Sequence, residues 1–490
     1  MFPHIANYRL GFNYALERNE TKNKYADTLT PVSFAFDTYS VYLKSDENKR
    51  NKYAVTFFTR ADKYPYGKSL IQSNRSMNLN LKAELLKNPE HQFTLDATFR
   101  KLKVINETLS PQKDDQTVLG RAQYVVNKWK GLLTGDVLYE LGSGQEQKRD
   151  FAYLEVPAGQ GQYVWNDYDS NGVQSLNEFE LALFPDQAKY IRVFTPTNQY
   201  IKSNYTTLNY SLNINPHAVL TGTDLKGMAN FVSRINLQSS MQISKKSVAK
   251  GDFEFNPFKY ELGDTALITL TTTILNTFSF NRFNTKWGID LSNLRSGGKS
   301  LLTYGYESRK QNNWNLKLRW NLSKSFTFTL NSQKGVTALF TASQVFDNRN
   351  YLLDIYSIGP TIDFIQGTSF RMSTGYKLET KENDPVYGGE KTNSNSFNFE
   401  SKYNILQSTS IAGKFTFDNI KFNSPTGSTS NSTTGYTMLD GLLPGKNYIW
   451  NLTLTKRLLN NLELSVQYDG RKPGTARTVH VGKASLTALF

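Results

Sequence analysis

The sequence has no cysteine and only four histidines among its 490 residues. The absence of cysteine excludes disulfide scaffolds, thiolate zinc sites, iron–sulfur clusters and cysteine nucleophiles. The four histidines are His4, His91, His217 and His480. Because they are scattered along the chain, a histidine-rich metal site is not expected. No apolar run approaches the roughly 18 residues of a membrane-spanning helix, so a helical membrane protein is excluded, whereas a membrane β-barrel is not.

The first residues also lack the basic and apolar segments of a signal peptide. Two expectations follow. Either the protein is cytoplasmic, or its precursor carries further residues before this sequence.

The dominant pattern is an alternation of apolar and polar residues in a chain that is 13% aromatic. In 314–322 the apolar residues occupy every second position, and the alternation resumes in 326–331 after a very short break. The same pattern recurs in 8–16, 208–215, 397–405, 450–455 and 462–468. A period of two is typical of a β-strand with one apolar and one polar face, and helical spacing is scarce.

We therefore predict an all-β protein, a large antiparallel transmembrane β-barrel of roughly 20 strands of about 9–11 residues each. Residues 1–145 and 203–490 are expected to form the barrel strands, and 146–202 an insert. Nearly every strand keeps a polar face that suits a hydrated lumen, while its apolar face suits lipid. The alternative is a soluble all-β protein whose apolar faces cover one another.

Loop lengths in the second half support the barrel. Short links are expected near 323–325, 366–368, 406–409 and 457–461, and long polar ones near 332–349, 379–395, 420–446 and 469–477. Short periplasmic turns and longer outer loops produce this alternation in outer-membrane barrels. The last strand ends on Phe490 in the apolar phase. It resembles the closing strand of bacterial outer-membrane barrels, which the barrel-assembly machinery reads.

The insert contains the most specific local motif, the run from Asp167 to Glu178. It matches the EF-hand calcium loop at ligand positions 1, 3, 5 and 12 and at the glycine of position 6. Side-chain oxygens are expected from Asp167, Asp169, Asn171 and Glu178, a carbonyl from Val173, and a direct or water-mediated contact from Ser175. Gln174 stands where an apolar residue is usual, so a solitary structural calcium loop is expected rather than a sensor. The alternative is an Asx-rich turn without metal.

A resemblance supports the same assignment. Residues 159–163, 166–169, 177–180 and 186–190, together with 477–490, resemble segments of large outer-membrane proteins of Bacteroidota. The resemblance implies an outer-membrane β-barrel within a longer parent chain, and it brings no catalytic site.

The distribution of charge and the lack of a catalytic motif argue against two classes of function, nucleic-acid binding and catalysis. The net charge of +15 is spread along strands rather than gathered in a stripe, so nucleic-acid binding is not expected. No serine, histidine and acid are brought together in a recognisable pattern, so we predict no enzyme. Three roles stay open in the Gram-negative cell outer membrane or at its surface: a structural or assembly subunit of a translocation machine, a porin-like channel for polar or anionic solutes, and a calcium-stabilised adhesin. The expected partners are outer-membrane lipid, lipopolysaccharide, the barrel-assembly machinery and other surface proteins.

Overall fold

The structure is a computed structural model. It describes residues 4–5, 8–110, 112–221, 226–249, 254–260, 262, 266–302, 305–342, 344–405, 408–425, 427, 430–458 and 462–488. The chain forms two compact units. The first comprises Met1–Lys148, Thr197–Thr221 and Gln238–Thr272, and the second comprises Arg149–Pro196, Gly222–Leu237 and Thr273–Phe490.

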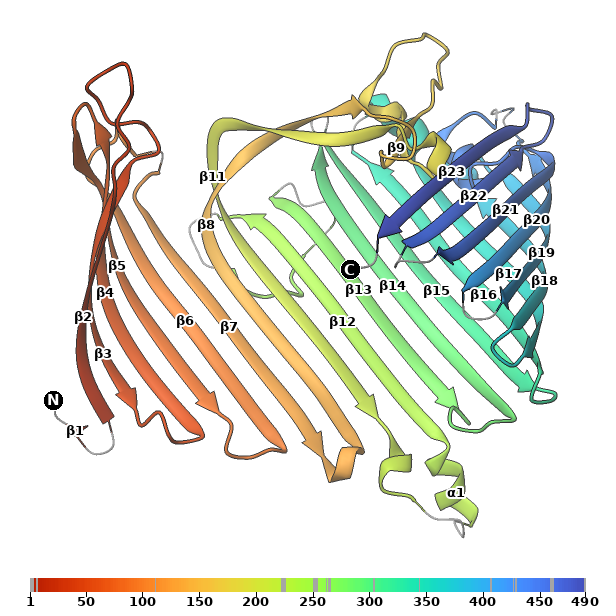
Figure 1. Cartoon of the computed structure of the whole chain (residues 1–490), viewed down its shortest axis with the longest axis horizontal. Helices are drawn as coiled ribbons and strands as arrows, with labels where there is room; N and C mark the ends of the chain where they lie inside the picture. Colours follow the sequence, from red (N-terminus) through yellow and green to blue (C-terminus); the bar gives the residue numbers. More distant parts are fainter. Residues whose placement is uncertain are drawn as a thin grey trace. The chain divides into compact units, whose positions relative to one another are not determined.

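The strands of the first unit are mostly long (Figure 1). Strands β8, β11, β12 and β13 also contribute residues to the second unit. They are β1 (His4–Ile5), β2 (Tyr8–Asn19), β3 (Phe34–Ser45), β4 (Asn51–Tyr66), β5 (Ser69–Leu85), β6 (His91–Val104), β7 (Asp115–Lys128), β8 (Leu133–Glu155), β11 (Tyr190–Ile214), β12 (Ile235–Val248) and β13 (Leu267–Phe280). From β2 to β8 each strand pairs with the next in antiparallel register.

The second unit continues the same construction. Its strands are β9 (Tyr163–Trp165), β10 (Phe179–Leu181), β14 (Trp287–Leu302), β15 (Gly305–Asn321), β16 (Phe326–Thr341), β17 (Tyr351–Gln366), β18 (Phe370–Asn383), β19 (Lys391–Ile405), β20 (Thr409–Asn423), β21 (Gly445–Leu458), β22 (Leu462–Lys472) and β23 (Val479–Ala488). From β14 to β23 each strand pairs antiparallel with its successor.

Helices are few and short in the described part of the chain. They are α1 (Gly227–Ser233), α2 (Thr433–Met438) and the 3-10 turns η1 (Trp129–Gly131), η2 (Leu176–Glu178), η3 (Pro185–Gln187), η4 (Pro216–Ala218), η5 (Gln344–Arg349) and η6 (Pro385–Tyr387). Neither α-helix has the length and hydropathy of a transmembrane span.

The prediction of an antiparallel all-β chain is confirmed. Of the 23 strands in the described part of the chain, β1, β9 and β10 have only two or three residues, which leaves twenty long strands there. The expected strand length was wrong, since β14 to β17 have 16 or 17 residues each. Polar residues at strand ends, assigned to loops from composition, continue the hydrogen-bonded ladder instead.

The longer strands also move the loop boundaries. The long loop expected at 332–349 is strand as far as Thr341, and the one expected at 379–395 is reduced to 384–390. The alternation of short and long connections is confirmed. The connection between β15 and β16 is only 322–325 and that between β17 and β18 only 367–369, whereas β16 and β17 are separated by 342–350. Phe490, singled out as the terminal aromatic residue, lies outside the described residues.

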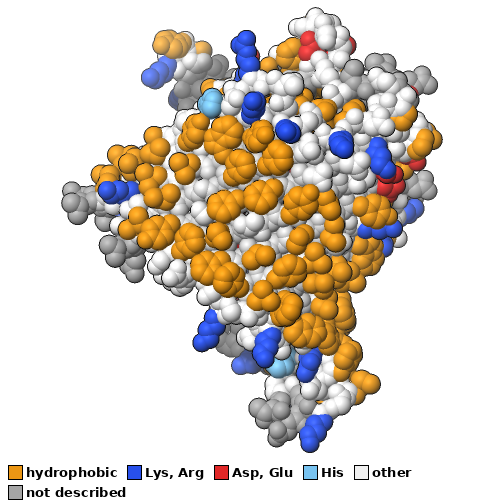
Figure 2. Space-filling view, turned by 90° about the vertical axis from the view of Figure 1, so that its right-hand side faces the viewer, with side chains coloured by type: hydrophobic (Ala, Val, Ile, Leu, Met, Phe, Trp, Pro, Cys, Tyr) orange, Lys and Arg blue, Asp and Glu red, His pale blue; other side chains and the backbone are white. Residues whose placement is uncertain are grey.

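The apolar face of the alternating strands is exposed. In β15, Trp314, Leu316 and Trp320 are each more than a third exposed. The same holds for alternate residues of neighbouring strands: Tyr356, Ile358, Ile362, Tyr376, Leu378, Phe397, Tyr403, Leu452, Val466 and Tyr468. Figure 2 shows hydrophobic side chains spread over one face of the molecule, with Lys and Arg at its borders. We call the exposed apolar residues of these strands, named above, the apolar band.

The opposite face of the same strands carries a small core. Because side chains alternate along a strand, Glu307 of β15 lies on the face opposite to the apolar band. Leu339 and Leu353 have the same orientation and pack with Met438 of α2. Ile420 packs with Leu439 and Leu442, which follow α2. The segment between β20 and β21 therefore folds back over the polar face of the second unit.

Candidate metal centre

The motif expected to hold calcium lies at the tip of a miniature hairpin. Strands β9 and β10 pair antiparallel, with Trp165 opposite Phe179 and Tyr163 opposite Leu181. The amide of Asn166 donates to the carbonyl oxygen of Glu178 at 3.0 Å and closes the base of the loop. The segment 146–202, predicted as an insert, is partly continuous with β8 and β11. Its part outside these two strands is 156–189.

Three of the predicted ligands come together. One carboxylate oxygen each from Asp167, Asp169 and Glu178 lies within 4.8 Å of the others. Oxygen ligands lie about 2.3–2.6 Å from a calcium ion, so two ligands of one ion can be at most about 5 Å apart. Three carboxylates this close repel one another unless a cation or protons intervene. The donor set therefore fits a hard divalent cation.

The remaining predicted ligands lie in the same turn. The amide oxygen of Asn171 accepts a hydrogen bond from the Val173 amide at 2.6 Å, and its amide nitrogen donates to Asp169 at 2.7 Å. The side chain of Val173 has no donor atom, so only its backbone carbonyl could bind a cation. The amide of Ser175 donates to Oε2 of Glu178 at 3.0 Å. Gly172 has a φ of +72°, a left-handed conformation that glycine adopts without strain.

Buried contacts orient the closing carboxylate. Glu178 is only 2% exposed, and its Oε2 also accepts a hydrogen bond from Nε1 of Trp165 at 2.9 Å. Asp167 accepts from the amides of Asn171 and Gly172 at 3.1 and 2.9 Å. These backbone donors hold the carboxylates in place, as a preorganised ligand set requires. Trp165 was not foreseen, because an indole in a short strand carries no metal-binding signal.

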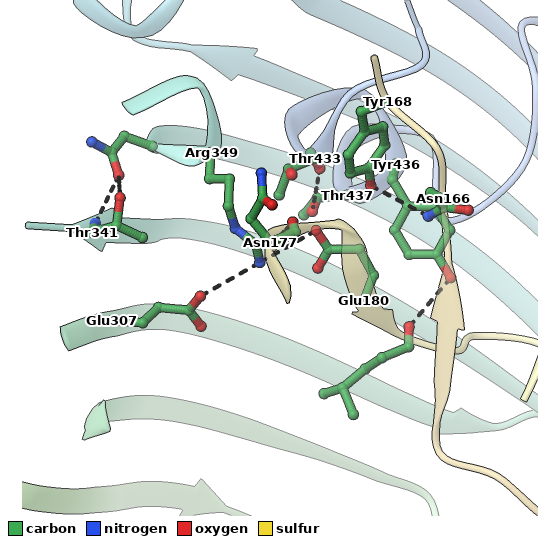
Figure 3. Close-up of polar contacts among 12 residues, drawn as sticks. Asn166, Tyr168, Asn177, Glu180, Glu307, Thr341, Arg349, Thr433, Tyr436 and Thr437 are labelled. Carbon is green, nitrogen blue, oxygen red and sulfur yellow. Dashed lines mark hydrogen bonds and ion pairs between the residues drawn. The ribbon is translucent and has the colours of Figure 1, made fainter. Parts of the chain in front are cut away.

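An arginine at the end of η5 anchors the loop (Figure 3). Nη1 of Arg349 donates to the carbonyl oxygen of Asn177, the residue before Glu178. Nη2 of Arg349 lies 3.4 Å from Oε1 of Glu180 and 3.4 Å from Oε2 of Glu307. All three side chains are nearly buried. Burial raises the pKa of the Glu180 carboxyl, and the Arg349 guanidinium opposes that shift.

A second contact comes from α2 and the residues before it. The hydroxyl of Tyr436 donates to the carbonyl oxygen of Leu181 at 3.2 Å and accepts from the amide of Leu183 at 3.3 Å. The side-chain amide of Asn431 donates to the carbonyl oxygen of Asp167 at 3.3 Å. Burial raises the pKa of Tyr168 well above its ordinary value, in keeping with its enclosed position beside α2 in Figure 3.

The third contact involves the segment after β10. Phe184 packs against the cluster of Ile420 and Leu439, and its ring lies 4.0 Å from the guanidinium carbon of Arg471. Nη2 of Arg471 donates to Asp186 at 2.7 Å. We call 156–189 the insert, and these contacts with Arg349, α2 and Arg471 its seat.

The chain was compared with known proteins. No family model and no curated protein matches the sequence. Among solved structures, the unliganded ferric citrate transporter FecA is similar at 10% identity and a TM-score of 0.37, covering 97% of this chain and 70% of that one.

Two further structures give similar values. The siderophore receptor PirA from Pseudomonas aeruginosa has 10% identity and a TM-score of 0.39, with coverage of 99% and 74%. The copper transporter OprC has 9% identity and a TM-score of 0.38, with coverage of 98% and 75%. Values this low assign neither a family nor a substrate.

Proposed function

We propose that the protein is an outer-membrane β-barrel protein of a Gram-negative cell, as its apolar band indicates. Isolated exposed apolar residues are ordinary on a soluble protein, but a contiguous apolar surface over many strands marks contact with lipid or another apolar partner. A soluble protein would cover this band with a second layer. The polar opposite face, with its seated insert, already carries the small core of the second unit, so lipid is the partner that remains for the band.

We further propose that the insert holds a structural calcium ion. Asp167, Asp169 and Glu178 would supply carboxylate oxygens, with Asn171, Val173 and Ser175 completing the shell. A bound cation would offset the repulsion between the three carboxylates and tie the two arms of the hairpin together. Its role would be structural, because it adds a crosslink to an insert that is already seated.

The role that the geometry supports best is that of a non-catalytic structural or assembly subunit, one associated with translocation across the outer membrane. The observation that carries it is the seat of the insert. An open porin needs a clear polar path, whereas here the insert and α2 are fixed over the polar face by nearly buried charged groups. The resemblance to Bacteroidota outer-membrane proteins supports the proposed outer-membrane location. Outer-membrane lipid and lipopolysaccharide would be its immediate surroundings.

Planar-bilayer conductance tests the role. We expect little steady current from the purified protein and a higher current when the insert is released by Arg349→Met together with Tyr436→Phe. The matched control is Arg319→Met, a polar-face arginine of β15 that contacts only the Asn284 carbonyl among the contacts we describe. A large steady current in the unaltered protein would favour the porin-like channel instead. Solubility without detergent would favour the adhesin.

A further inference from the structure

One end of the second unit carries apolar side chains that extend past the strands. Helix α1 precedes β12 and lies beyond the sheet at the end where the short connections occur (Figure 1). Its Met228 is 75% exposed and its Phe231 is 52% exposed. Exposed apolar side chains are ordinary when isolated, so the meaning of these two depends on whether they continue the apolar band.

The residues that follow α1 are hydrogen-bonded to the turn between β13 and β14. The amide of Asn281 donates to the carbonyl oxygen of Arg234 at 2.9 Å, and Nη1 of Arg282 donates to Asn236 at 3.1 Å. These bonds connect the residues after α1 to the turn between β13 and β14. The position of α1 is therefore fixed relative to that turn.

A chain of ring contacts continues from α1 into the apolar band. The ring of Phe231 lies 5.3 Å from that of Phe280, which lies 5.8 Å from that of Trp287. Trp287 is opposite Trp320 in the sheet, and Trp320 is opposite Phe328. Further rings in contact follow at the same end of β16 to β19: Phe326, Phe364, Phe370 and Tyr403.

The charges in the described residues of α1, the start of β12 and the turn after β13 have one sign. Residues 226–237 and 281–287 contain four basic residues and no acidic one: Lys226, Arg234, Arg282 and Lys286. All four are exposed. Aromatic residues at the level of the lipid headgroups, with basic residues just beyond them, are typical of a membrane interface.

We propose that α1 is an interfacial anchor that inserts Met228 and Phe231 among the phospholipid headgroups at the short-turn end of the strands. The inference rests on the proposed membrane location and adds a specific lipid-contacting element outside the strands. Its occupant is phospholipid rather than a protein, because the helix continues the lipid-facing aromatic row and its basic residues complement headgroup phosphates. Anchoring would hold the turn between β13 and β14 at the membrane interface.

The absence of cysteine allows a direct test, since one introduced thiol can be labelled uniquely. The full chain would be reconstituted in vesicles of phosphatidylethanolamine and phosphatidylglycerol with an environment-sensitive dye at Met228→Cys. Ile362→Cys on β17 serves as the lipid-facing reference, and Val386→Cys, which is 84% exposed in η6, as the water-facing one. We expect the dye at 228 to emit further to the blue than at 386 and to be quenched by headgroup-attached spin labels.

The outcomes separate the two proposals. If the dye at 362 reports an apolar environment and the dye at 228 one as aqueous as at 386, the anchor is refuted and the membrane location stands. If the dyes at 362 and 228 both report an aqueous environment, the membrane location is refuted and the anchor with it. As a second measurement, Lys226→Glu with Lys286→Glu should shift the emission at 228 to the red in vesicles containing phosphatidylglycerol. No change there would contradict the proposed headgroup contact.

Discussion

Replacing Arg349 with methionine tests the seat of the insert most directly. The substitution removes the hydrogen bond to the Asn177 carbonyl and the cation shared by Glu180 and Glu307. Breaking a buried ion pair by deleting one partner costs about 3–5 kcal/mol. We expect the lower end, about 3 kcal/mol, because Arg309 still lies 2.9 Å from Glu307 and Glu180 can take up a proton.

The assay is hydrogen exchange of the amides in β9 and β10. At about 1.4 kcal/mol per tenfold change, a loss of about 3 kcal/mol raises the opening equilibrium on the order of a hundredfold. The amides of β17 and β18 provide an internal reference, and Arg319→Met is the matched variant. Adding Glu180→Gln to Arg349→Met should recover part of the loss, since the carboxylate left without its cation is then neutral. Unchanged exchange in β9 and β10 of Arg349→Met would refute the reasoning.

Three further predictions concern the proposed metal site, the ion pair between Asp186 and Arg471, and the apolar band. Terbium bound at the site should luminesce by energy transfer from Trp165. Glu178→Gln should abolish this luminescence and Asp384→Asn should leave it intact. Equal signals in the two variants would contradict the assigned metal site. Asp186→Asn should lower the free energy of opening of the insert by only about 1.5 kcal/mol, because Asp186 is a quarter exposed. Hydrogen exchange as slow as in the unaltered protein would count against the bond between Asp186 and Arg471. Leu316→Arg should cost about 2–4 kcal/mol of folding free energy in liposomes while Asn315→Arg on the polar face costs much less, and equal costs would contradict lipid contact.

The proposed calcium loop and the seat illustrate how a local signal and a tertiary one combine. The loop presents its carboxylates through backbone hydrogen bonds within a few residues, so its ligand set is readable along the chain. The seat depends on Arg349 and Arg471, which lie 172 and 285 residues from the atoms they contact. Such charges look like ordinary polar-face residues until the strands place them together.

The alternation of apolar and polar residues by itself determined the strands, their faces and the antiparallel class, because the side-chain period of a strand is a local property of the backbone. It could not determine strand length, since Asn, Ser and Thr at strand ends suit a ladder as well as a loop. The residues of the proposed calcium loop could likewise be picked out from the sequence, because the candidate ligands are close along the chain. Only the tertiary structure decided that Trp165 orients Glu178, that Arg349 joins Glu180 to Glu307, and that Phe231 continues the aromatic row. Each of these contacts depends on strand register and loop return, which bring distant residues together and leave no periodic trace in the sequence.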